Sequence, residues 1–133
     1  MENNKYHILI VEDDKEIRDG VEIYLKNQGY QVWKAANGKE GLEIVAQEEI
    51  HLAILDIMMP VMDGLTAART IRDLERQDAK TIPIIAMTAN AFREDAEKCM
   101  EAGMNAHLAK PLDDEKIKQT ISEELRKQNA CHE

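Results

Sequence analysis

Acidic residues stand next to apolar stretches at two places in the sequence, where they could take part in chemistry. The triplet Glu12-Asp13-Asp14 directly follows one apolar run, and Asp56 interrupts another. Because charged residues are rarely buried without a partner, Asp56 is expected to have a specific role. If it meets the triplet, the carboxylates repel one another unless a cation holds them, and hard oxygen ligands favour Mg²⁺. Asp56 is also a candidate nucleophile that would form an aspartyl phosphate.

Two further polar residues, Thr88 and Lys110, end later apolar stretches. Their hydroxyl and ammonium groups, together with Mg²⁺, would stabilise the oxygens of a phosphoryl group during transfer. Each group also has a simpler interpretation. The acidic triplet could be a helix N-cap with acidic first-turn residues, Thr88 a strand-end hydroxyl or helix cap, and Lys110 a solvated surface charge.

The elements that must position these residues follow from hydrophobic periodicity, because apolar runs alternate with helical spacing five times. The predicted strands cover residues 7–11, 31–36, 52–57, 82–87 and 107–109. Apolar residues at helical spacing place helices around 17–25, 42–45, 65–74, 92–103 and 113–127, with Gly29 ending the first. Continuous apolar strands indicate a parallel sheet covered on both faces, and right-handed crossovers make it doubly wound. The fold class is therefore α/β, (βα)₅.

In open parallel sheets, sites form outside the carboxyl ends of the strands. The triplet, Asp56, Thr88 and Lys110 all follow or end predicted strands, so they are expected at one edge of the sheet. This coincidence favours the functional interpretation over the simpler ones.

Composition bounds the class of protein. The chain has 133 residues and a formal net charge of -9, which suits one soluble domain that repels nucleic acid and anionic lipid. We expect a single domain over 1–133 with a core of about 6–127, no direct nucleic-acid or membrane binding, and no signal peptide. Cys99 and Cys131 form no metal-spaced motif and are expected as reduced thiols in the cytoplasm.

The order and spacing of these residues resemble the receiver domain of two-component response regulators over roughly residues 6–127. The matching segments are Ile8-Leu9-Ile10-Val11-Glu12-Asp13, Leu55-Asp56-Ile57-Met58-Met59-Pro60, Met62-Asp63-Gly64, Met87-Thr88-Ala89 and Lys110-Pro111. The resemblance implies a flavodoxin-like sheet with strand order 2-1-3-4-5.

The resemblance also implies roles for the acidic edge. Asp56 matches the phosphoacceptor and, with Asp13, a direct ligand of Mg²⁺. Glu12 matches the first acidic position, which reaches the ion through water, and Met58 matches the residue that lends its backbone carbonyl. Asp14 falls at a position that the family varies, so it is not expected to be a ligand.

Thr88 and Lys110 match the pair that contacts the phosphoryl group. His107 stands where the family often has Tyr or Phe as a rotamer switch. We therefore expect Thr88 and His107 to change position on phosphorylation, although His107 could also be a partly exposed strand residue without that role. The sequence leaves open whether the parent is a hybrid kinase or a separate regulator, and whether phosphorylation leads to dimerisation.

The implied function is a phosphoacceptor that takes its phosphoryl group from the phosphohistidine of a histidine kinase or phosphotransfer protein. It would change the surface of the fourth helix and fifth strand for a downstream protein or output domain, and would catalyse only its own phosphorylation and dephosphorylation. The alternative is a haloacid-dehalogenase-like phosphatase, but those enzymes carry Asp-x-Asp on the first strand, and Asp56-Ile57-Met58 lacks the second Asp. A flavin-binding carrier is disfavoured because the acidic triplet would repel the flavin phosphate.

Overall fold

The computed structural model describes residues 6–56, 64–73, 82–88, 97, 100–109 and 113–131. They form one five-stranded parallel sheet in the order β2-β1-β3-β4-β5. The strands are β1 (His7–Val11), β2 (Gln31–Ala35), β3 (Leu52–Asp56), β4 (Ile84–Thr88) and β5 (Ala106–Ala109). The helices are α1 (Lys15–Asn27), α2 (Gly38–Gln47), α3 (Gly64–Asp73) and α6 (Asp114–Cys131). The predicted doubly wound fold and strand order are confirmed.

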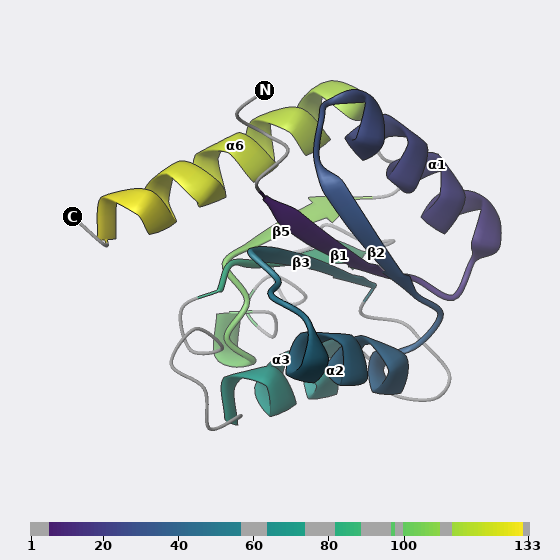
Figure 1. Cartoon of the computed structure of the whole chain (residues 1–133). Helices are drawn as coiled ribbons and strands as arrows, with labels where there is room; N and C mark the ends of the chain where they lie inside the picture. Colours follow the sequence, from purple (N-terminus) through teal and green to yellow (C-terminus); the bar gives the residue numbers. More distant parts are fainter. Residues whose placement is uncertain are drawn as a thin grey trace.

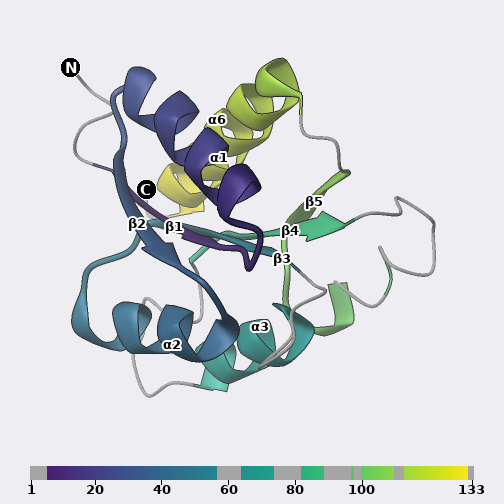
Figure 2. The same ribbon diagram turned by 90° about the vertical axis from the view of Figure 1, so that its right-hand side faces the viewer.

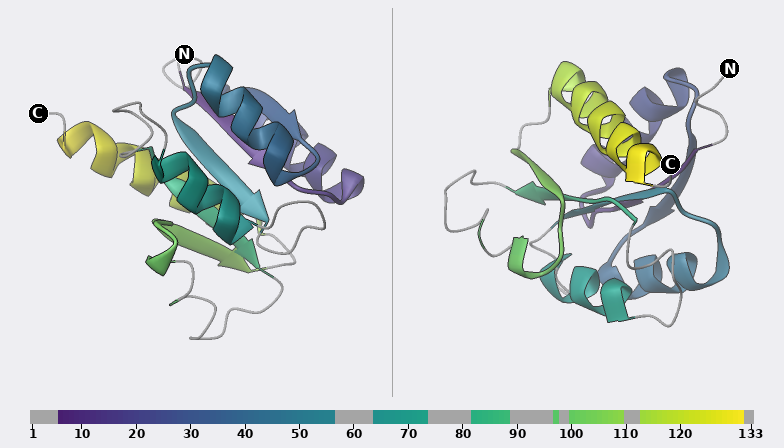
Figure 3. Two further views of the ribbon diagram at one scale, coloured as in Figure 1. Left: turned by 90° about the horizontal axis from the view of Figure 1, so that it is seen from below. Right: turned by 90° about the vertical axis from the view of Figure 1, so that its left-hand side faces the viewer.

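The sheet lies between two helical layers. Helices α1 and α6 cover one face, and α2 and α3 cover the other (Figures 1 and 2). Figure 3, which shows the molecule from below and from the left-hand side of Figure 1, has the same layers, with β5 as an outermost strand of the sheet. Among the described residues, no helix has the length and apolar character needed to cross a membrane.

The side chains of β1 explain why its apolar run is continuous. Leu9 and Val11 pack into the core beneath α2 and α3, whereas Ile8 and Ile10 pack into the core beneath α1 and α6. Because successive strand side chains point to opposite faces, a strand covered on both sides must be apolar at every position. All four side chains are fully buried.

Gly29 ends α1 as the sequence predicts. Its φ is 97°, a left-handed conformation that favours glycine. The Gly29 N–H donates to the carbonyl of Lys26 at 3.0 Å, and the Tyr30 N–H donates to that of Leu25 at 3.1 Å. This pair of bonds is a Schellman motif, and it turns the chain directly into β2.

Several predicted boundaries differ from the structure by a few residues. Strand β2 ends one residue earlier than expected, and β5 begins one residue earlier. Strand β4 begins at Ile84 rather than at 82, because Pro83 has no N–H for the ladder, although its carbonyl accepts from Ala53 N at 3.0 Å. Helix α6 continues to Cys131, four residues beyond the predicted end at 127.

The fourth predicted helix is described only in part. Glu97, Met100 and Glu101 are helical, and Gly103 follows with a φ of 93°. Cys99 lies outside the described residues.

Candidate functional site

The carboxyl edge of the sheet brings the acidic residues together. Strands β1 and β3 are neighbours, and Val11 lies opposite Leu55. Glu12 follows Val11 and Asp56 follows Leu55, so the two acidic residues lie side by side at the carboxyl ends of β1 and β3. The N–H of Glu12 also donates to the carbonyl of Ala35 at 3.1 Å, which extends the β1–β2 ladder by one bond.

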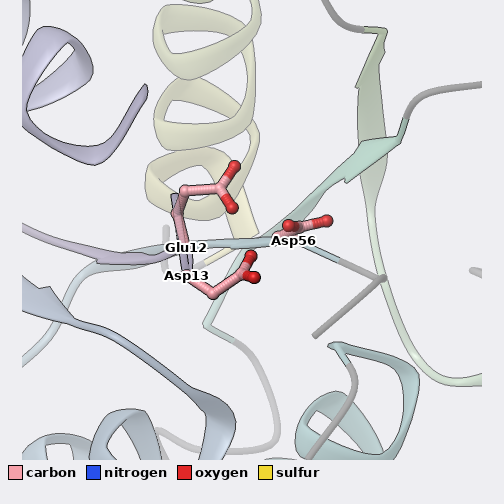
Figure 4. A group of neighbouring side chains, drawn as sticks. All are labelled: Glu12, Asp13 and Asp56. Atoms are coloured by element: carbon pink, nitrogen blue, oxygen red, sulfur yellow. The ribbon is translucent and has the colours of Figure 1, made fainter. Parts of the chain in front are cut away.

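Glu12, Asp13 and Asp56 form one cluster. Each offers a carboxylate oxygen, and these three atoms lie within 4.8 Å of one another. Figure 4 shows the three side chains directed into one space beyond the ends of β1 and β3. Glu12 is 0% and Asp56 3% exposed, whereas Asp13 is exposed. The acidic group of the sequence prediction is thus assembled by the fold.

Asp14 has a different position from the other members of the triplet. Its side chain accepts hydrogen bonds from the N–H groups of Glu16 at 2.9 Å and Ile17 at 3.3 Å, so it is the N-cap of α1. Its own N–H donates to Oε2 of Glu12 at 3.2 Å. The helix-cap interpretation therefore holds for Asp14, while the other two acidic residues belong to the cluster.

Arg18 contributes to the site in a way that sequence reasoning missed. Its Nη1 donates to the backbone carbonyl of Glu12 at 2.8 Å. The guanidinium thus fixes the chain where β1 ends and the acidic residues begin. In the sequence, Arg18 is marked only by its position near the start of the helix that follows the acidic triplet. That position does not predict a hydrogen bond to the carbonyl of Glu12.

Thr88 and His107 lie on the neighbouring strands β4 and β5. Asp56 is opposite Met87, and Thr88 is opposite Ala109, so Thr88 reaches the same edge as the acidic cluster. Thr88 is buried, with 2% of its surface exposed. His107 is exposed in the middle of β5, opposite Ala86.

Met58 and Lys110 lie outside the described residues. Their roles remain predictions.

The cluster has the chemistry of a divalent-cation site. Two buried carboxylates and one exposed carboxylate within a few ångströms repel one another, and desolvation increases the cost of their charges. A cation would offset both effects. The donor set consists of oxygen atoms alone, which suits a hard ion such as Mg²⁺ that keeps several waters.

Known proteins are similar to this chain in both sequence and fold. The family model for the response regulator receiver domain matches residues 8–122. The regulatory protein VanR of Enterococcus faecium is 40% identical over 120 residues, which are 90% of this chain and 50% of VanR. The chain thus spans about half the length of that relative.

Two solved structures are similar over almost the whole chain. A CheY-like response regulator receiver domain protein from Methanospirillum hungatei JF-1 has 31% identity and a TM-score of 0.86, covering 94% of this chain and 97% of that one. The receiver domain of the sensor histidine kinase PA1611 from Pseudomonas aeruginosa PAO1 has 33% identity and a TM-score of 0.82, covering 90% and 97%. The latter structure has a magnesium ion coordinated in its active site cleft.

Fold and site together define a flavodoxin-like α/β protein with an acidic cluster at the carboxyl edge of its sheet. The chain belongs to the response regulator receiver domain family, the phosphoacceptor domains of two-component signalling. The phosphatase alternative is not supported by these matches.

Proposed function

We propose that Asp56 is the residue of this receiver domain that accepts the phosphoryl group. The observation that carries the proposal is the burial of Asp56 at the end of an apolar strand, within 4.8 Å of two further carboxylates. Burial of a carboxylate next to like charges costs free energy of folding, so a carboxylate at this position is expected to serve the chemistry of the site. Its place at the carboxyl end of β3 suits attack on a phosphorus atom that approaches the ends of the strands.

The donor in this proposal is the phosphohistidine of a histidine kinase or phosphotransfer protein. An oxygen of the Asp56 carboxylate forms a bond to phosphorus while the P–N bond to histidine breaks, and the histidine nitrogen takes a proton. The product is an acyl phosphate, and no oxidant or reductant is needed. The chain catalyses only this reaction and the hydrolysis of its product.

Glu12, Asp13, Asp56 and the backbone carbonyl of Met58 would hold Mg²⁺, with Glu12 acting through water. When bound, the ion supplies positive charge to the phosphoryl oxygens. Lys110 and the hydroxyl of Thr88 would contact the same oxygens. The carboxylate oxygens of Glu12, Asp13 and Asp56 already lie within 4.8 Å of one another, so these three residues need no large rearrangement to share an ion.

The switch in this proposal involves β4, β5 and the helix between them. Thr88 turns its hydroxyl toward the new phosphoryl group, and the space that it leaves admits the ring of the exposed His107. The changed surface then binds a downstream protein or output domain. The ring resonances of His107, followed by NMR as beryllofluoride and Mg²⁺ are added, check this step, and an unchanged ring environment would remove His107 from it.

We place the protein in the cytoplasm and expect no direct contact with nucleic acid, because the net charge of -9 repels phosphate backbones. Cell fractionation and a DNA-binding assay at low salt test these two points. Recovery in a membrane or secreted fraction would contradict the first, and retention of DNA would contradict the second.

Incubation with acetyl phosphate and Mg²⁺ tests the central proposal. The chain should gain one phosphoryl group in an adduct that is stable in acid and labile in base. Asp56→Asn should gain none, whereas Asp14→Asn should be labelled like the wild type because its amide oxygen can still cap α1. Labelling of Asp56→Asn at the wild-type rate would assign the chemistry to another residue.

A further inference from the structure

Arg72, in the last turn of α3, joins three segments of the chain that are distant in sequence. Its Nε and Nη2 both donate to the carbonyl of Gly103, at 3.0 and 2.7 Å, and Nη2 also donates to Oδ1 of Asn105 at 2.9 Å. The same Oδ1 accepts from the N–H of Ile84 at 2.9 Å, and the N–H of Asn105 donates to the carbonyl of Ile84 at 2.7 Å. We call these four residues the Arg72 clamp.

The clamp is closely fitted around Gly103. This residue has a φ of 93°, and a Cβ atom there would lie 3.0 Å from Cγ and 3.2 Å from Nε of Arg72. The conformation therefore favours glycine, and the contact leaves little room for a Cβ atom. Burial lowers the pKa of the Arg72 guanidinium, although an arginine still keeps its charge. Its hydrogen bonds are thus charge-assisted and partly withdrawn from water, which strengthens them.

The clamp lies at the end of the sheet opposite the acidic cluster. Ile84 is the first residue of β4, and Asn105 directly precedes β5. The other ends of these two strands carry Thr88 and its partner Ala109 at the phosphoryl edge. Strands β4 and β5 are therefore fastened to α3 at their amino-terminal ends, and phosphorylation would act on them at their carboxyl ends.

We propose that the Arg72 clamp is the fixed pivot of the switch: it holds the amino-terminal ends of β4 and β5 in place while phosphorylation displaces their carboxyl ends. The inference rests on the proposed function and adds positioning residues to it. The guanidinium of Arg72 bonds to the backbone carbonyl of Gly103 and to the side chain of Asn105, which also accepts from the N–H of Ile84 in β4. Bonds in these different directions resist both translation and rotation of β5. Displacement at the phosphoryl edge is then confined to the surface around His107.

The test is amide hydrogen exchange by NMR on the full chain, with and without Mg²⁺ and beryllofluoride. In the wild type, the amides of Ile84 and Asn105 should keep their protection when the phosphoryl mimic binds, while the resonances of His107 shift. Arg72→Lys keeps the positive charge but loses the planar set of N–H donors of the guanidinium. In this variant, amide hydrogen exchange at Ile84 and Asn105 should become faster by a factor on the order of ten or more. In the same variant, binding of the mimic should shift the His107 resonances less than in the wild type. It should also change the amide protection of Ile84 and Asn105.

Three variants control this test. Arg69→Lys makes the same change on an exposed arginine of α3 and should behave as the wild type. Ile121→Val weakens the core under α6, on the face of the sheet opposite Arg72 and α3, and should leave the protection of Ile84 and Asn105 unchanged although it lowers stability. Asn105→Asp keeps the acceptor that Arg72 and Ile84 share, so it should keep the protection of Ile84. The wild-type measurement with and without the mimic tests the pivot even if Arg72→Lys folds poorly.

Two results would overturn the pivot. One is unchanged exchange at Ile84 and Asn105 in Arg72→Lys, and the other is loss of their protection in the wild type when the mimic binds. Labelling by acetyl phosphate is measured on the same samples. If the wild type and Arg72→Lys are both labelled but exchange shows either result, the pivot alone fails, whereas absence of labelling in both would reject the proposed function.

Discussion

Three adjacent acidic residues at the end of β1 have three different environments. Glu12 is buried, Asp13 is exposed but belongs to the same cluster, and Asp14 caps α1. Their spacing explains the difference. The strand continues to Glu12 through its bond to Ala35, and the helix already uses Asp14, so only one residue lies between the two elements.

Replacement of Asp13 by Asn should have opposite effects with and without Mg²⁺. With a chelator present, Asp13→Asn should be more stable than the wild type by on the order of 1 kcal/mol, the repulsion of two unit charges about 4 Å apart in water. With saturating Mg²⁺, the wild type should gain about 2.7 kcal/mol at an ion concentration one hundred times its Kd, and the variant much less because it lost a ligand. Chemical denaturation with and without Mg²⁺ measures both effects.

Asp14→Asn is the matched control for this experiment. It removes an equal charge one residue away but keeps an oxygen that can cap α1, so its Mg²⁺ affinity should stay within about twofold of the wild type, since exposed charges are screened by solvent. A variant at Asp14 that loses as much Mg²⁺ affinity as Asp13→Asn would contradict the assignment of the two residues.

The sequence predicts the acidic part of the site well, because an aspartate in an apolar strand and an acidic group after another strand are visible without a structure. It does not predict Arg18, whose contact is to a backbone carbonyl and depends on where α1 begins. The Arg72 clamp is hidden for the same reason. Its acceptors are a carbonyl and an amide oxygen, which sequence patterns do not mark.

At the scale of the elements, two helical glycines differ in their surroundings. A Cβ atom at Gly20, in α1, would meet nothing within 4 Å, whereas one at Gly41, in α2, would lie 2.7 Å from Cγ2 of Val11. Val11 precedes the acidic cluster, so the close approach of α2 to β1 helps to fix the edge where the site forms. The glycine at position 41 is therefore required by packing, and that at position 20 is not.

Alanine at these two positions should consequently change stability in opposite directions. Gly20→Ala should raise the free energy of unfolding by about 0.5–1 kcal/mol, because alanine loses less backbone entropy in a helix. Gly41→Ala should lower it by roughly 1–3 kcal/mol, the usual effect of overpacking a core. Urea denaturation of both variants checks the signs. Equal destabilisation by the two substitutions would contradict the packing of α2 on β1.

Boundaries of elements were harder to predict than their order. The apolar Ile82 predicts a strand from residue 82, but Pro83 cannot donate to the sheet, and β4 begins after it at Ile84. For α6, the sequence predicts an end near 127, after the last periodic apolar residue, Leu125. It continues because Gln128, Asn129 and Ala130 include no glycine or proline that would end it.

At the scale of the whole molecule, periodicity predicts five strands and their parallel direction but does not by itself give their order. The order 2-1-3-4-5 came from the family resemblance, and the structure confirms it. The order matters for function because it makes β1 and β3 neighbours. Two acidic segments more than forty residues apart thereby share one edge, where a phosphoryl group and a cation can be held together.

The position of the phosphoryl group is the most direct test of this account. After reaction with acetyl phosphate and Mg²⁺, borohydride reduces an aspartyl phosphate to homoserine, which peptide mass spectrometry can locate in the chain. The account predicts homoserine at position 56 and none at positions 12, 13 or 14. Homoserine at one of those three positions, with Asp56 unchanged, would contradict it.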